Sequence, residues 1–297
     1  MTRRTLALLA IPLVGCASLI GATFDDAHLG GDGAAPDVAD EHASDAAEPD
    51  VHDAAPFDPA SIANLAFWID AAYGVMVDAD ASNAVTTWYD RSGLSRHAVP
   101  AGGGTQSPKL VPGALAGEPV VHFSSADPDL LRATWSGPDG PALTMFLVAR
   151  GYANSALRFQ SNIGAFPFMI FPLDFVSDAS SPSFRFDVAP AQPNYTALQT
   201  EFDGGAAVLS ATWGADGAAA TFLDGVLVEQ RVGLDPALPS NQTLYIGGAL
   251  PLLAQPSTRL PFADADVAEA IVYDKALDES ARCAVEEYLL DKWAIAP

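Results

Sequence analysis

The chain has 297 residues, and its 37 aspartate and glutamate residues outnumber its 14 lysine and arginine residues to give a formal net charge of −23 at pH 7. So acidic a chain, without a basic stripe, repels phosphate backbones, which argues against nucleic-acid binding. Its 2 cysteines exclude a disulfide-rich fold, so a folded part of this length has to rely on an apolar core.

The first sixteen residues have the features of an export signal. Arg3 and Arg4 give a positive start, and residues 6–14 form an apolar run too short to span about 30 Å of hydrocarbon. The run ends in residues 13–16 (LVGC), which resemble the lipobox of bacterial lipoproteins. By that resemblance, residues 1–16 carry the signal peptide and Cys16 is the lipidated residue. An ordinary signal peptide and a stop-transfer helix are the alternatives.

Residues 17–60 are expected to form an extended acidic spacer. Eleven acidic residues and no lysine or arginine lie between Asp25 and Asp58, and large apolar side chains are scarce. Such a segment cannot bury enough surface to offset its ordering entropy. Residues 61–297 are then expected to form one domain, held off a membrane by the spacer. Because no aspartate directly follows Cys16, the expected location is the cell envelope, outside the cytoplasm, at the outer membrane.

The body beyond the spacer is expected to be all-β. Short apolar-rich runs are broken by Gly, Pro, Asp and Ser every eight to twelve residues, which is typical of a sandwich or barrel. Asp224 and Gly225 suit the positive φ angles of a tight hairpin. The expected strands are Leu143–Arg150, Phe166–Phe171, Phe184–Val188, Ala206–Trp213, Thr221–Leu223, Val226–Glu229 and Leu244–Gly247.

One helix is predicted near the C-terminus. Asp278 can cap its start, and Cys283 lies within it. If Cys16 is acylated, Cys283 has no intramolecular partner and is expected to be a buried, inert thiol. The apolar stripe that would dock on the sheet consists of Ala281, Val285, Tyr288, Leu289 and Trp293.

Three groups of motifs follow one another along the body. They are residues 65–71 (LAFWIDA), 85–93 (VTTWYDRSG) and 117–123 (GEPVVHF); residues 221–227 (TFLDGVL) and 245–247 (YIG); and residues 266–277 (DVAEAIVYDKAL) and 285–293 (VEEYLLDKW). Together they resemble the concanavalin A-like, laminin-G-like domains of secreted bacterial proteins. The resemblance implies a jelly-roll sandwich of two antiparallel sheets with a C-terminal helix. It implies much less about function, because this fold hosts lectins, glycosidases and adhesion domains.

Residues 264–269 (DADVAE) provide one enzymatic alternative. Laminarinase-type glucanases on this fold place acids as E-x-D-x-x-E, which this segment matches with aspartate in the first place. On a regular strand Asp264 and Asp266 share a face and Glu269 points the other way, so a bulge would be required. The segment aligns better with the structural strand of the non-catalytic relatives. The chain is therefore expected not to be an enzyme.

A calcium ion is the one cofactor that the sequence suggests. Asp70, Asp90 and Asp274 lie close to predicted loops, and sandwiches of this class often hold calcium at a sheet rim. Solvated surface carboxylates are the alternative. His122 alternates with apolar residues on a predicted strand and is expected to be structural.

Loop aromatics are the candidates for stacking on a sugar ring. Trp135, Tyr152 and Tyr195 have loop-like surroundings. The tryptophans in strand patterns, Trp68, Trp88 and Trp213, are expected in the core instead.

The leading hypothesis for the function is a surface-anchored, non-catalytic binding or adhesion module for a glycan or a protein. The alternatives are a glycoside hydrolase on the same fold and a structural envelope lipoprotein without a small ligand.

Overall fold

The protein is described by a computed structural model over residues 57–296, apart from the short gaps given at the end of this paragraph. For the described residues between 152 and 203 other than Leu198, and for residue 242, only the backbone is described. The gaps are residues 81, 103–105, 125, 128, 136, 138–139, 154–156, 162–168, 179–180, 189–195, 202–203, 234–241 and 249–263.

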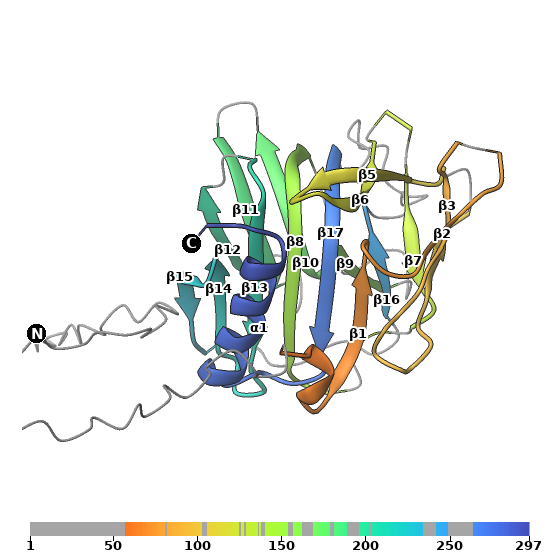
Figure 1. Cartoon of the computed structure of the whole chain (residues 1–297). Coiled ribbons are helices and arrows are strands. Elements are labelled where there is room, and N and C mark those ends of the chain that lie inside the picture. Colours follow the sequence, from red (N-terminus) through yellow and green to blue (C-terminus); the bar gives the residue numbers. More distant parts are fainter. Residues whose placement is uncertain are drawn as a thin grey trace, which may run out of the picture.

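The described residues form two antiparallel sheets that lie face to face (Figure 1). Sheet A contains β1 (Leu65–Asp70), β5 (Lys109–Leu115), β6 (Glu118–Phe123), β8 (Leu143–Ala153), β13 (Ala207–Trp213), β14 (Ala219–Leu223), β15 (Val226–Arg231) and β17 (Asp264–Tyr273). Its strand order is β15-β14-β13-β8-β17-β6-β5, and β1 also pairs with β17.

Sheet B lies behind sheet A in Figure 1. Its strand order is β12-β11-β10-β9-β16-β7-β4-β3-β2. The prediction of two antiparallel sheets is confirmed. The strands of sheet B are β2 (Val75–Val77), β3 (Val85–Trp88), β4 (Ala98–Pro100), β7 (Leu131–Ala133), β9 (Leu157–Ser161), β10 (Met169–Asp178), β11 (Ser181–Val188), β12 (Thr196–Glu201) and β16 (Gln242–Ile246).

The predicted C-terminal helix is also confirmed, as α1 (Glu279–Lys292), which lies across the outer face of sheet A (Figure 1). Its N-cap is Asp278, whose carboxylate accepts a hydrogen bond from the Ala281 backbone N–H at 2.9 Å. The predicted hairpin joins β14 to β15, with φ angles of 49° at Asp224 and 79° at Gly225. Among the described residues, none of the helices is long and apolar enough to cross a bilayer.

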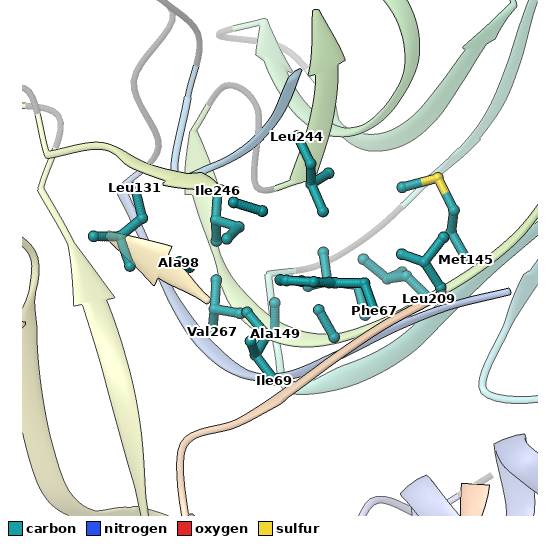
Figure 2. Close-up of a cluster of buried hydrophobic side chains, with 14 of the residues drawn as sticks. Phe67, Ile69, Ala98, Leu131, Met145, Ala149, Leu209, Leu244, Ile246 and Val267 are labelled. Atoms are coloured by element: carbon teal, nitrogen blue, oxygen red, sulfur yellow. The ribbon is translucent and has the colours of Figure 1, made fainter. Parts of the chain in front are cut away.

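Two apolar clusters stabilise the body. One fills the space between the sheets, where Phe67, Ile69 and Leu209 of sheet A face Leu244 and Ile246 of sheet B (Figure 2). The other lies between sheet A and the helix. Its members from the two layers include Trp68, Phe146, Val148, Ile271, Tyr273, Val285, Leu289 and Trp293. Sheet A is therefore buried on both faces wherever α1 covers it.

Residues 57–60, which precede the expected start of the domain at residue 61, contact the rest of the described body. A short 3-10 helix, η1 (Pro59–Ser61), follows its N-cap Asp58. The hydroxyl of Tyr273 donates to the Pro59 carbonyl at 2.9 Å, and the ring of Phe57 packs 6.0 Å from that of Tyr288. Residues 57–60 thus pack on the domain through the Phe57 ring and the Pro59 carbonyl.

Strand β17 changes partners midway along one edge. Its residues 265–267 pair with β6, and its residues 269–273 pair with β1, while β8 runs along the other edge. A β-bulge between Val267 and Glu269 lies at this change. The bulge shifts the alternation of side chains, so Glu269 lies on the outer face together with Ala268.

Candidate ligand-binding surface

The three aspartates proposed for calcium do not come together. Asp274 donates its backbone N–H to the Asn64 carbonyl, at the end of β1 opposite to Asp70. The Asp70 carboxylate accepts from Arg91 Nη1 at 2.5 Å and from Lys292 Nζ at 2.6 Å. In the described part of the chain, no group of three or more His, Cys, Asp or Glu side chains is arranged to hold a metal ion.

Asp90 organises a loop. Its carboxylate accepts from the backbone N–H groups of Trp68 at 3.0 Å, Ser92 at 2.9 Å and Arg96 at 2.9 Å, and from the Ser92 hydroxyl at 2.7 Å. These donors occupy both carboxylate oxygens. Asp90 therefore orders the turn that follows it, and its oxygens are already committed to protein donors.

Of the three aromatic residues expected to stack on a sugar ring, the structure describes only the side chain of Trp135. Trp135 is 7% exposed and stacks on Phe67 at 6.4 Å, with the Arg96 guanidinium 4.4 Å from its ring. Its ring is part of the core and offers no open face to a sugar, so the expectation of an exposed platform at Trp135 is corrected. The side chain of Tyr152 and all of Tyr195 lie outside the described residues. The three tryptophans expected in the core are buried there: Trp68, Trp88 and Trp213.

Cys283 is disulfide-bonded in the structure, which differs from the expected free thiol. The only other cysteine in the sequence is Cys16, which lies outside the described residues. A thioether to a lipid and a disulfide use the same sulfur atom. Lipidation of Cys16 and a disulfide between the two cysteines of the chain therefore exclude each other.

Exposed apolar side chains gather where β1 turns into β2 and β3, a surface that the sequence alone did not indicate. We call it the tyrosine patch: Tyr73 (62% exposed), Met76 (49%), Tyr89 (39%) and Leu94 (51%). The other exposed large apolar residues of the described chain are three valines on β5 and at the two ends of β15. Grouped exposed apolar side chains of this kind mark interaction sites more often than scattered ones do.

Tyr73 is held in place by its neighbours. The turn that carries it is fixed by hydrogen bonds from the Tyr73 N–H to the Asp70 carbonyl at 3.0 Å and from the Ala72 N–H to the Asp70 carboxylate at 3.0 Å. The Arg91 guanidinium lies 4.6 Å from the Tyr73 ring and 3.8 Å from the buried Trp68 ring. Because Arg91 is also paired with Asp70, this stack ties an exposed ring to the core.

The second tyrosine of the patch is similarly fixed. The Tyr89 backbone N–H donates to the Gly74 carbonyl at 2.9 Å, and its hydroxyl lies 3.0 Å from Met76 Sδ. Its ring meets His97 edge-on at 4.8 Å, and His97 Nδ1 accepts from the Asp90 N–H at 3.1 Å. Gly74 adopts a φ of 78°, and a Cβ there would approach Tyr89 Cβ to 3.2 Å, so a side chain at this position would be strained and would crowd Tyr89.

The acid of the enzymatic alternative, Glu269, is completely buried. The bulge that a shared face requires is present, but α1 covers the carboxylate. It accepts from the indoles of Trp68 at 2.7 Å and Trp293 at 2.8 Å, from Lys292 Nζ at 2.7 Å and from the Tyr288 hydroxyl at 3.1 Å. Desolvation and the nearby Asp70 raise the pKa of Glu269, and Lys292 opposes that rise. A substrate has no access to this carboxyl, which instead clamps the helix to the sheet.

No family model and no curated protein sequence matches this chain. Among solved structures, the binding domain of botulinum neurotoxin DC in complex with rat synaptotagmin II is similar, with a TM-score of 0.51 and 9% identity over 76% of this chain and 52% of that chain. A structure of botulinum neurotoxin type C, whose cell entry depends on interaction with two ganglioside molecules, has a TM-score of 0.51 and 10% identity over 76% of this chain and 51% of that chain. A Trypanosoma rangeli sialidase in complex with sialic acid has a TM-score of 0.48 and 13% identity, over 78% of this chain and 33% of that chain. The chain spans about half the length of the two neurotoxin structures, and at this identity the likeness shows a shared β-sandwich fold alone.

Proposed function

We propose that this protein is a membrane-anchored, non-catalytic recognition module that binds a glycan through the tyrosine patch. The observation that carries the proposal is the pair of exposed tyrosine rings, Tyr73 and Tyr89, which protein contacts hold in fixed positions. A rigid ring loses little conformational entropy when a ligand packs on it, so the contact is favourable without further ordering. Arg91 and His97, which are partly exposed, lie beside the patch and supply polar groups for sugar hydroxyls.

The architecture supports a binding role. The two neurotoxin structures with similar folds are of a binding domain in complex with a protein and of a toxin that interacts with gangliosides. The motifs that resemble laminin-G-like domains extend the same expectation to this chain. The burial of Glu269 supports a non-catalytic role, because it removes one carboxyl of the segment that resembles the glucanase motif.

Substitution of Tyr73 by alanine is expected to weaken glycan binding about tenfold or more, which corresponds to roughly 1.4 kcal/mol. A glycan array would first identify an oligosaccharide that the wild-type protein binds. Calorimetry would then measure the affinity of the wild type and of each variant for that oligosaccharide. Tyr89→Ala is expected to weaken binding as well, because both rings belong to the patch.

Val232→Ala is the matched control. Val232 is 74% exposed and follows β15, away from β1 and β2 in the strand order of the sheets, so its loss should leave the affinity unchanged. Equal losses for Val232→Ala and Tyr73→Ala would contradict a specific role of the patch. Silence on the array, combined with capture of a protein that Tyr73→Ala no longer captures, would replace the glycan by a protein ligand.

The anchored state requires a lipid on Cys16 and therefore a reduced Cys283. In protein extracted from bacterial membranes, we expect mass spectrometry to find an acylated N-terminal peptide beginning at Cys16. After denaturation, Cys283 is then expected to react with iodoacetamide without prior reduction. Cys16→Ser should move the protein to the soluble fraction. An unmodified Cys16, together with a Cys283 that alkylates only after reduction, would overturn the anchor.

A further inference from the structure

A row of four polar side chains crosses neighbouring strands on the outer face of sheet A. Lys109 on β5 pairs with His122 on β6, and Asp266 on β17 pairs both with His122 and with Arg150 on β8. Residues directly opposite each other on antiparallel strands share a face. Neighbouring strands are about 4.8 Å apart, so His122 and Arg150 flank Asp266 at a separation of about 10 Å between their Cα atoms.

Asp266 orients the two side chains beside it. One carboxylate oxygen lies 2.8 Å from His122 Nδ1, and the other accepts from Arg150 Nε at 2.7 Å. The His122 and Arg150 side chains remain 40% and 39% exposed, whereas Asp266 is 16% exposed. The carboxylate thus forms the base of the row, and the outer ends of the imidazole and the guanidinium face solvent.

The contact with Asp266 decides what each side chain offers to a ligand. A carboxylate only accepts, so Nδ1 of His122 carries the proton and Nε2 of the neutral ring is an acceptor. Arg150 uses Nε for Asp266, and its two Nη groups make no hydrogen bond within the described residues. The row therefore presents a forked donor next to a single acceptor.

This donor and acceptor pattern matches a ligand that carries a carboxylate and a hydroxyl close together. The guanidinium fork binds a carboxylate through two parallel hydrogen bonds, and a hydroxyl can donate to Nε2 of His122. A neutral sugar lacks the first group, and a simple carboxylic acid lacks the second.

The surroundings favour a ligand with one negative charge over a dianion. Asp127 and Asp264 are exposed near the row, and Asp129 lies close enough to Lys109 for the ammonium charge to act on it. Burial raises the pKa of Asp129 to about 6, against the hydrogen bond from the Ser124 N–H. In a chain with a net charge of −23, one guanidinium and one lysine suit a carboxylate better than a phosphate dianion.

From this geometry we infer a second binding site, distinct from the tyrosine patch, in which Arg150 and His122 bind a hydroxycarboxylate such as a sugar acid. Arg150 holds the carboxylate, His122 accepts from the hydroxyl, and Asp266 positions both. Lys109 adds a positive charge at the end of the row. The inference does not depend on the proposed function, since Tyr73 plays no part in it.

The site is tested by NMR titration of the folded domain with glucuronate, glucose, acetate and inorganic phosphate, with the His122 ring signals as the local reporter. Glucuronate is expected to shift these signals and to bind at least tenfold more tightly than acetate or phosphate, whereas glucose leaves them in place. Arg150→Gln and Arg150→Lys should each weaken glucuronate binding about tenfold or more, because both remove the fork. Circular dichroism of both variants serves as the control for folding, and the comparison uses a variant that keeps the wild-type spectrum.

Arg231→Gln is the charge-matched control, since Arg231 is exposed on β15 and pairs only with Glu229 among the described residues. It should leave glucuronate binding unchanged, as should Tyr73→Ala. Glucuronate that leaves the His122 signals unmoved would overturn the site. Phosphate or acetate that binds as tightly as glucuronate would overturn the ligand class. A loss in Arg231→Gln equal to that in Arg150→Lys would reduce the effect to overall charge and overturn the fork.

Discussion

Replacement of Glu269 by alanine is expected to lower the free energy of unfolding by about 3–5 kcal/mol. The buried carboxylate accepts from two indoles, an ammonium and a phenol, which come from both the sheet and the end of the helix. Its removal leaves the Trp68 and Trp293 N–H groups buried without their acceptor, and each such group costs about 1–3 kcal/mol. Urea denaturation followed by circular dichroism measures the difference.

Two further variants separate this explanation from a general effect of removing a glutamate. Glu118→Ala changes an exposed glutamate on β6 of the same sheet and should alter the stability by no more than about 0.5 kcal/mol. Glu269→Gln keeps the volume and one acceptor oxygen, so its loss should be smaller than that of Glu269→Ala. A Glu269→Ala protein that unfolds at the wild-type urea concentration would contradict the clamp.

Local sequence signals predicted the elements that depend on local physics. The cap at Asp278 and the Asp224-Gly225 hairpin both form as expected, because each is decided by a few neighbouring residues. The faces on which the side chains of β17 lie could not be predicted in this way. Its bulge lies where β6 gives way to β1, two strands far apart in sequence, and nothing in the segment 264–269 marks that change.

The candidate binding surface was harder to predict from the sequence than the fold was. Trp135 has loop-like neighbours in the sequence, yet its ring is buried in the core. It packs against Phe67 and under the Arg96 guanidinium, and such contacts between residues far apart in sequence decide its burial. Tyr73 and Tyr89 were overlooked for the opposite reason. They flank apolar strand motifs that suggest burial, yet both side chains are exposed where Gly74 turns the chain into β2 and β2 pairs with β3.

A second buried ion pair fixes α1 to sheet A and leads to the other large prediction. Arg282 pairs with Glu286 one turn later in the helix, and the Ser210 hydroxyl of β13 donates to the same carboxylate. The Arg282 guanidinium lies 3.6 Å from the Phe222 ring. Both charged side chains are almost completely buried, so each depends on the other for compensation of its desolvation.

Arg282→Met is expected to cost about 3–5 kcal/mol of unfolding free energy, because it removes the guanidinium that pairs with the buried Glu286 carboxylate. The double variant Arg282→Met, Glu286→Leu should recover most of that loss, since two apolar side chains replace two charges that no longer have to be desolvated. Losses that simply add in the double variant would show that the two residues act independently.

The cost of Arg282→Met should also depend on pH. Burial already raises the pKa of Glu286 in the native protein, with Arg282 as the main opposing influence, and loss of that guanidinium removes the opposition. A carboxyl whose pKa is higher in the folded than in the unfolded state binds its proton more tightly when folded, so stability falls as pH rises between the two values. The deficit of Arg282→Met relative to the wild type should therefore be larger at pH 8 than at pH 5 in urea denaturation. A deficit that stays constant over this range would mean that lost packing against Phe222, rather than the uncompensated charge, accounts for the destabilisation.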